Sequence, residues 1–305
     1  DGSEGLAHSF IDALYDINCK AIKFQIHLSE FESSRQDQFR VNFSYEDKNR
    51  YDYWQRMEFT PEQWEGLKKH ADQKGLIFLS SVFSLKAVDM LNKVGVEAWK
   101  IGSGETTNSL LLSTLIETKK PVLISTGMSN WEEIDQSVNF VRSNGTPLAI
   151  FQCTSAYPTD LKDVGINILN EMIKKYDFPV GLSDHSGTVY PSLLGMSLGA
   201  NLLEVHVTFH KKMFGPDVSA SLTLDELKHI RKSRDAFIKM HNNKLDKNDM
   251  SNRLEPMRKL FTKSVALVDG QLKGTVLTKN MLTTKKPGTG IPAKDLELCV
   301  GKKLH

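Results

Sequence analysis

The chain has 305 residues, of which 40% are hydrophobic and 25% charged, and this composition excludes disordered, collagen-like and disulfide-scaffold proteins. Its 39 Lys and Arg residues nearly balance 37 Asp and Glu residues, so no basic nucleic-acid footprint is expected. The three cysteines form no Cys-x-x-Cys pair, and no apolar run reaches the roughly 18 residues of a membrane span. We therefore expect a cytoplasmic protein whose partner is a small molecule, with neither nucleic acid nor a membrane as a partner.

A helical pattern over residues 6–17 comes first, and short apolar runs then alternate with further helical patterns. The predicted strands cover residues 21–25, 77–82, 97–102, 121–126, 148–154, 178–183 and 202–208. Helix starts are marked at Thr60-Pro61-Glu62 and at Ser129, which acidic residues follow. A last barrel helix is expected over 224–240. Strands that alternate with helices pair in parallel, so the class is α/β.

These seven strands are one fewer than a (β/α)₈ TIM barrel requires, and the predicted fold is that barrel with its first strand apparently missing. A doubly wound open sheet is the alternative, but it usually carries a Gly-rich phosphate turn that this chain lacks. If strand one is absent, two strands have unpaired edges. We expect a version with that strand restored to be more stable and more active.

Three regions are predicted: a barrel domain over 1–241, a polar linker over 242–258, and a small β-rich module over 259–305 that looks cut off at its C-terminus. Residues 27–60 form a long polar and aromatic stretch between a strand and its helix, far longer than usual βα loops. We interpret this stretch, called the 27–60 segment below, as a lid or a subunit contact.

In a (β/α)₈ barrel the active site lies at the C-terminal ends of the strands. The polar residues predicted there are Lys23, Gln25, Ser80, Ser81, Lys100, Ser103, Glu105, Ser125 and Thr126. A single serine at such a position is usually a turn cap, but hydroxyls and lysines together suit a phosphate or carboxylate. Lys100 could instead act as a Schiff-base nucleophile, although the clustering favours phosphate.

His185 and His206 are predicted at the ends of neighbouring strands, close enough to share one divalent metal ion. A lone strand histidine is usually a core residue, but two at adjacent strand ends favour an open metal site. Mn²⁺ or Mg²⁺ there would serve as a Lewis acid. Asp217, in the loop after the last strand, could contact a sugar hydroxyl or be a turn residue.

Eight segments in chain order resemble the sialic acid synthases, that is, N-acetylneuraminate synthase and its legionaminic and pseudaminic acid relatives. They are KFQ at 23–25, SSVFS at 80–84, WKIGSGE at 99–105, STGM at 125–128, CTSAYP at 153–158, GLSDHS at 181–186, EVH at 204–206 and FGPD at 214–217. The resemblance implies a barrel enzyme that condenses phosphoenolpyruvate with N-acetylmannosamine or a related N-acyl hexosamine and releases phosphate. It also implies an antifreeze-like (SAF) domain at the C-terminus, exchanged across a homodimer.

By position, the resemblance assigns each predicted residue a role. Phosphoenolpyruvate contacts fall on Lys23, Ser81, Lys100, Ser103, Ser125 and Ser183, metal ligands on His185 and His206, and sugar contacts on Gln25, Glu105, Tyr157 and Asp217, with Lys23, Glu105, Tyr157 and Asp217 as catalytic residues. This chain departs from the pattern at Ser155, where several members have Asn, and at Lys286, where many have Arg. The Glu and the Asn-His-x-Gly segment of the family's first strand do not appear.

Two other functions are compatible with these residues. One is a Schiff-base barrel aldolase that uses Lys100. The other is a non-catalytic protein of the same fold that binds sugar acids or serves as a scaffold. The acceptor sugar stays open, although the PGTGI segment at 287–291 looks more like the neuraminate and legionaminate members.

Overall fold

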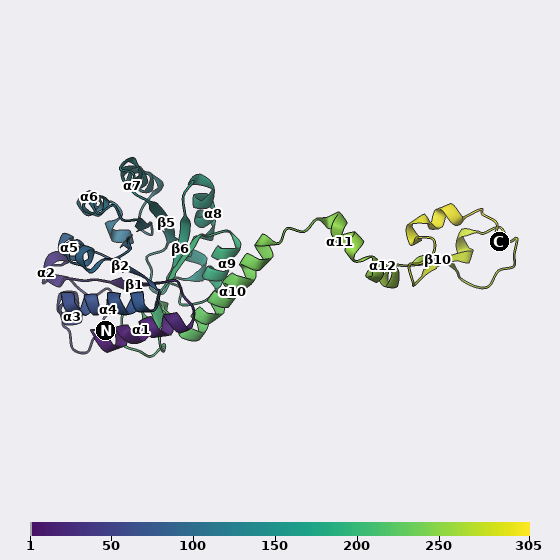
Figure 1. Ribbon diagram of the computed structural model, residues 1–305. Helices are drawn as coiled ribbons and strands as arrows, with labels where there is room; N and C mark the ends of the chain where they lie inside the picture. The colour runs from purple at the N-terminus through teal and green to yellow at the C-terminus, as the bar shows by residue number, and fades with distance from the viewer. Residues whose placement is uncertain (1) are drawn as a thin grey trace. The chain divides into compact units, whose positions relative to one another are not determined.

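The computed structural model describes residues 2–305, which divide into two compact units at Lys239 and Met240. In the first unit, seven of the described strands form one parallel, curled sheet in the order of the sequence (Figure 1). Its strands are β1 (Ala21–Gln25), β2 (Ile77–Ser81), β3 (Ala98–Ile101), β4 (Val122–Ser125), β5 (Leu148–Cys153), β6 (Val180–Asp184) and β7 (Leu202–Val205). The predicted α/β class with a parallel sheet is thus confirmed, with β1 and β7 as the edge strands of this sheet.

Helices surround the outer face of the sheet (Figure 1). In the first unit they are α1 (Glu4–Asp16), α2 (Ser29–Glu32), α3 (Arg50–Met57), α4 (Pro61–Gln73), α5 (Leu85–Val94), α6 (Ser109–Glu117), α7 (Trp131–Ser143), α8 (Ile166–Lys175), α9 (Tyr190–Ser197) and α10 (Leu224–Asn242), whose last turn lies past the boundary. Thr60 caps α4 as predicted, in a capping box with Gln63. The predicted cap Ser129 is wrong by one residue, because Asn130 pairs with Glu133 to form the capping box of α7.

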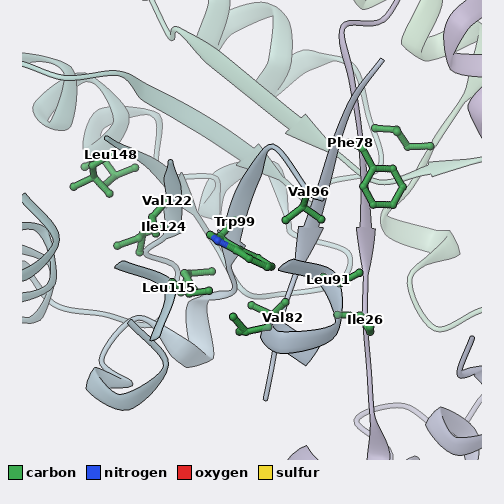
Figure 2. Close-up of a cluster of buried hydrophobic side chains, with 14 of the residues drawn as sticks. Ile26, Phe78, Val82, Leu91, Val96, Trp99, Leu115, Val122, Ile124 and Leu148 are labelled. Carbon is green, nitrogen blue, oxygen red and sulfur yellow. The ribbon is translucent and has the colours of Figure 1, made fainter. Parts of the chain in front are cut away.

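The alternation of side chains along each strand separates the core from the interior of the curled sheet. In β1, Ile22 is buried in the core and Lys23 points to the other face, and in β3 the same holds for Trp99 and Lys100. Figure 2 shows part of this core around Trp99, whose indole N–H donates to the Thr118 hydroxyl at 2.8 Å. In these two strands one face therefore packs in the apolar core, and the other carries a lysine that lines the pocket described below.

The predicted strand over 202–208 is wrong as a single strand, because it is interrupted at His206. β7 pairs with β6, whereas β8 (Val207–Thr208) pairs with β9 (Leu222–Thr223) in a separate small sheet. The backbone carbonyl of His206 accepts a hydrogen bond from Leu222 N at 2.7 Å, so the chain leaves the main sheet at this residue. The break places His206 at the end of the strand, beside the loop that follows.

The 27–60 segment contains α2 and α3 and an aromatic cluster. Phe43 packs against Tyr53, with ring centroids 4.9 Å apart, and against Phe214, at 5.4 Å. Phe39 adjoins Phe43 at 5.2 Å. Because Phe214 follows β8, this cluster joins the 27–60 segment to the loop that precedes β9.

The second unit, residues 240–305, is small and has its own apolar cluster of Leu277, Leu282 and Cys299. Its elements are α11 (Lys247–Arg253), α12 (Glu255–Phe261), β10 (Ser264–Leu267) and β11 (Leu282–Lys285), and the two strands pair antiparallel. The stretch predicted as a linker is helical in part, because Asp246 caps the first turn of α11 and Pro256 lies in the first turn of α12.

Among residues 2–305, no helix combines the length and the apolar character needed to cross a membrane. The longest helix, α10, has charged residues throughout its sequence.

Candidate active site

A polar pocket lies at the C-terminal ends of the strands of the main sheet. Its lining residues are Lys23, Gln25, Ser81, Lys100, Gly102, Ser103, Ser125, Cys153, Tyr157, Ser183, His185, Glu204 and His206. The strand register aligns several of these residues, because Gln25 pairs with Ser81, Ser81 with Lys100, and Ser183 with Glu204. Most of the residues predicted from the strand ends are therefore brought together here.

The charged centre of the pocket is Glu204, which lies between two lysines. Its Oε1 is 3.6 Å from Lys23 Nζ and 3.7 Å from Lys100 Nζ, and it accepts a hydrogen bond from Ser183 Oγ at 3.3 Å. Lys100 is almost fully buried, with a side chain 3% exposed. Two cations held around one anion leave this part of the pocket with a net positive charge.

Burial and mutual attraction set the protonation of this centre. Burial by itself would raise the pKa of Glu204, but the nearby charges of Lys100 and Lys23 outweigh it and lower that pKa to about 2. Burial also lowers the pKa of Lys100, and the negative charge of Glu204 partly offsets this effect. Glu204 is therefore an ionised carboxylate at neutral pH.

Each lysine is held by a neighbouring serine. Lys100 Nζ donates to Ser125 Oγ at 2.5 Å and to the Ile101 carbonyl at 3.1 Å, and Lys23 Nζ donates to Ser81 Oγ at 3.3 Å. Such ammonium and hydroxyl groups are donors that suit phosphate or carboxylate oxygens. This part of the pocket can therefore bind an anion.

His185 and His206 lie side by side on the other flank of the pocket, with ring centroids 5.2 Å apart. His185 Nδ1 lies 3.0 Å from the Thr154 carbonyl, which can only accept, so this nitrogen carries the proton and Nε2 is free to bind. Burial lowers the pKa of both rings and keeps them neutral at pH 7. Tyr157 stacks on His185 at 4.1 Å.

Two adjacent neutral imidazoles, one of them oriented by a carbonyl, are donors of the kind that bind a divalent metal ion. No group of three His, Cys, Asp or Glu side chains converges as a metal site in the described chain. An ion held by His185 and His206 would therefore need its other ligands from water or substrate oxygens.

Asp217 lies beside the histidines and is held by a residue of the 27–60 segment. Its Oδ2 is 3.9 Å from His206 Nδ1, and its Oδ1 accepts from Arg40 Nη2 at 2.6 Å. The Arg40 guanidinium also lies 4.2 Å above the centroid of the Tyr157 ring. The 27–60 segment therefore contributes directly to the edge of the pocket.

Besides Asp217, three residues that the resemblance assigns to the site are not among those that line the pocket, and neither are the predicted strand-end residues Ser80 and Thr126. Glu105 accepts a hydrogen bond from Asn108 at 2.7 Å, just after β3. The Ser155 hydroxyl lies beside Gly127, where an added Cβ would meet it at 2.6 Å. Lys286 belongs to the second unit, where its Nζ is 5.1 Å from the centroid of Phe261.

No role was predicted for Glu204 or Arg40 from the sequence, although both contact site residues. A signal existed for Glu204, since it precedes His206 by two residues and so lies on the same face of the strand. No local signal existed for Arg40, because it comes from an irregular segment far from Asp217 in the chain. Gly102 and Cys153 complete the lining.

Comparison with known proteins decides the family. Residues 10–245 match the NeuB family. The chain belongs to this family, that of the sialic acid synthases. N,N'-diacetyllegionaminic acid synthase of Campylobacter jejuni is 30% identical over 99% of this chain and 92% of its own, and human N-acetylneuraminate-9-phosphate synthase is 30% identical over 99% and 85%. The crystal structure of a Leptospira borgpetersenii N-acetylneuraminic acid synthetase with citrate superposes with a TM-score of 0.74, at 27% identity, over 85% of this chain and 88% of that one.

The segments that carry the resemblance to sialic acid synthases are the ones that build the pocket. The segments at 23–25, 80–84, 99–105, 125–128, 153–158, 181–186 and 204–206 each contribute at least one lining residue. The last segment, 214–217, contributes Asp217, which faces His206. The resemblance seen in the sequence and the geometry of the pocket thus rest on the same segments.

Proposed function

We propose that this chain is a nonulosonic acid synthase that condenses phosphoenolpyruvate with N-acetylmannosamine or a related N-acyl hexosamine and releases phosphate. The observation that carries the proposal is a single pocket with an anion-binding half and a histidine half. The first half has Lys23 and Lys100 around Glu204, and the second has His185 beside His206. The names of the family members quoted above support the same type of product.

The anion-binding half suits phosphoenolpyruvate, which carries both a phosphate and a carboxylate. Lys23 and Lys100 supply positive charge. The hydroxyls of Ser81 and Ser125 accept hydrogen bonds from these lysines, and that of Ser183 donates to Glu204, so all three hydroxyls lie where they could also bind the anion. Because Lys100 is buried, its interaction with an anion is poorly screened by water. These groups would hold the enol with its reactive carbon toward the acceptor, which is a proximity and electrostatic role.

The histidine half would hold a divalent metal ion, Mn²⁺ or Mg²⁺, through His185 and His206. Such an ion supplies Lewis-acid polarisation of the acceptor's aldehyde when it is bound. The protein's contribution is to present neutral imidazoles, with the ring of His185 fixed by its hydrogen bond to the Thr154 carbonyl.

The acceptor would occupy the space between Gln25, Tyr157 and Asp217. Burial raises the pKa of Tyr157, so its hydroxyl stays protonated at neutral pH and can donate to a sugar oxygen. Asp217 is an acceptor for sugar hydroxyls. Glu105 and Ser155 would act from the edge of the pocket.

Further parts of the proposal concern the assembly. We propose that the second unit is a SAF-type domain and that Lys286 reaches the sugar site of a partner subunit in a homodimer. Lys286 keeps the positive charge of an arginine but lacks its two-pronged guanidinium. The three cysteines are free thiols, which supports a reducing compartment such as the cytoplasm.

The decisive experiment measures phosphate release from phosphoenolpyruvate with a panel of N-acyl hexosamines, first with Mn²⁺ and then with EDTA. We expect release that depends on both the acceptor and the metal ion, and the preferred acceptor names the substrate. A folded protein that binds phosphoenolpyruvate but releases no phosphate with any acceptor would favour the non-catalytic binding protein.

One observation also favours a Schiff-base aldolase, because burial lowers the pKa of Lys100 and such a lysine is a better nucleophile. Its Nζ, however, also lies 3.7 Å from the Glu204 carboxylate, whose negative charge favours the protonated, non-nucleophilic form. Treatment with borohydride in the presence of substrate separates the two. A covalent adduct on Lys100 would support the aldolase, and its absence alongside phosphate release would support the synthase.

A further inference from the structure

Arg40 is the residue of the 27–60 segment that touches two predicted sugar-binding residues at once. Its Nη2 donates to Asp217 Oδ1 at 2.6 Å, and its guanidinium plane lies 4.2 Å above the Tyr157 ring centroid. Asp217 and Arg40 are 177 positions apart in the chain. This contact therefore depends wholly on the tertiary structure.

Both residues that Arg40 touches are also in contact with the histidine pair. The Tyr157 ring stacks on His185 with centroids 4.1 Å apart. The second oxygen of Asp217 is 3.9 Å from His206 Nδ1. One guanidinium thus contacts both the ring that stacks on His185 and the carboxylate that lies beside His206 Nδ1.

The packing of the 27–60 segment keeps Arg40 in place. Phe43 lies against Tyr53 and Phe214, and Phe214 is three residues before Asp217. Arg56 Nε and Nη2 donate to the two carboxylate oxygens of Asp47 at 2.9 and 2.6 Å, which closes the segment on itself. Arg40 is therefore presented by a structured segment.

We propose that Arg40 is a specificity-determining positioning residue for the acceptor sugar. The inference rests on the proposed function, because it concerns the acceptor half of the same pocket. Arg40 donates a hydrogen bond to one carboxylate oxygen of Asp217. The carboxylate thus keeps a fixed orientation in which its other oxygen can accept a hydrogen bond from a sugar hydroxyl. The planar face of Arg40 holds the Tyr157 ring at the same time.

Of the two long cationic side chains, only arginine can both pair with Asp217 and lie flat on the Tyr157 ring. A lysine at this position could pair with Asp217 but has no planar group to lie on the ring. The side chain of Arg40 is 42% exposed, so the pair is partly solvated and its loss weakens the site without unfolding it. Neither Lys23 nor Lys100 contacts Arg40, and so the phosphoenolpyruvate half is not expected to change.

The test compares Arg40→Ala and Arg40→Lys with the matched variant Arg35→Ala. Arg35 lies in the same segment and stacks on Tyr51 at 4.9 Å, away from the pocket lining. For R40A we expect the KM for the acceptor sugar to rise by about 5-fold, as for loss of a partly exposed charge pair that orients Asp217. The KM for phosphoenolpyruvate and the melting temperature should stay close to those of R35A.

Two further readouts separate positioning from a structural role. R40K should recover only part of the acceptor affinity, because it restores the charge but not the stacking. Ethylguanidine at low millimolar concentration should lower the acceptor KM of R40A and leave that of R35A unchanged.

An R40A variant with wild-type acceptor KM would overturn the inference. So would an R40A variant in which the KM values for both substrates rise together with a fall in melting temperature. A wild-type protein that releases no phosphate with any acceptor refutes the proposed function itself, which is a separate result.

Discussion

Glu204→Gln tests whether the buried charge centre is built as described. The substitution keeps the shape of the side chain but removes the negative charge that lies 3.6 Å from Lys23 and 3.7 Å from Lys100. The buried ammonium of Lys100 then loses the carboxylate that offsets its desolvation, and the cost of burying a charge without a counter-ion is large. We expect E204Q to be folded but less stable than the wild type at neutral pH.

The magnitude follows from the pKa of Glu204. Each unit by which the pKa is lowered corresponds to about 1.4 kcal/mol. Lowering the pKa of Glu204 from 4.5 to about 2 therefore contributes about 3 kcal/mol to the free energy of unfolding at pH 7. Because the folded-state pKa lies below the unfolded one, this stability is fully present above pH 4.5 and is lost as the pH falls toward 2. The difference in the free energy of unfolding between wild type and E204Q should therefore fall to about 2 kcal/mol at pH 3.5.

The assay is urea unfolding at several pH values between 3.5 and 7, with EDTA present and phosphate absent, because a bound anion would replace the missing carboxylate. Glu132→Gln, which changes an exposed carboxylate on α7, is the control and should alter the free energy of unfolding by less than about 0.5 kcal/mol. A difference in the free energy of unfolding between wild type and E204Q that stays constant from pH 7 to pH 3.5, or that is absent, would refute the reasoning.

Three further predictions follow from single contacts. Ser125→Ala removes the hydroxyl that accepts a hydrogen bond from Lys100 Nζ at 2.5 Å, and we expect the KM for phosphoenolpyruvate to rise about tenfold while the KM for the acceptor sugar stays unchanged. Equal rises in both KM values would contradict this prediction. His206→Ala should abolish metal-dependent phosphate release, and wild-type turnover with Mn²⁺ would remove His206 from the site. In Gly181→Ala the new Cβ would meet the Phe151 ring at 2.6 Å, so the melting temperature should fall, with a loss of about 2 kcal/mol; unchanged stability would show that the interior has room.

The strands and most of the pocket could be predicted because their signals are local. A strand alternates its faces with a period of two, so Lys100 between Trp99 and Ile101 is assigned to the face opposite the core from the sequence alone. The parallel arrangement then brings the strand ends together. The break at His206 could not be predicted in this way, because it depends on a hydrogen bond to Leu222 from a later strand.

The amino-acid sequence alone was enough to predict the α/β class and to bring the lysines, serines and histidines of the pocket together, because each depends on which face of a strand a residue occupies. Only the tertiary structure decided how Glu204 is shared between two lysines and how Arg40 holds Asp217. The physical reason is that ion pairs and ring stacking act over a few ångströms in space and leave no periodic trace along the chain.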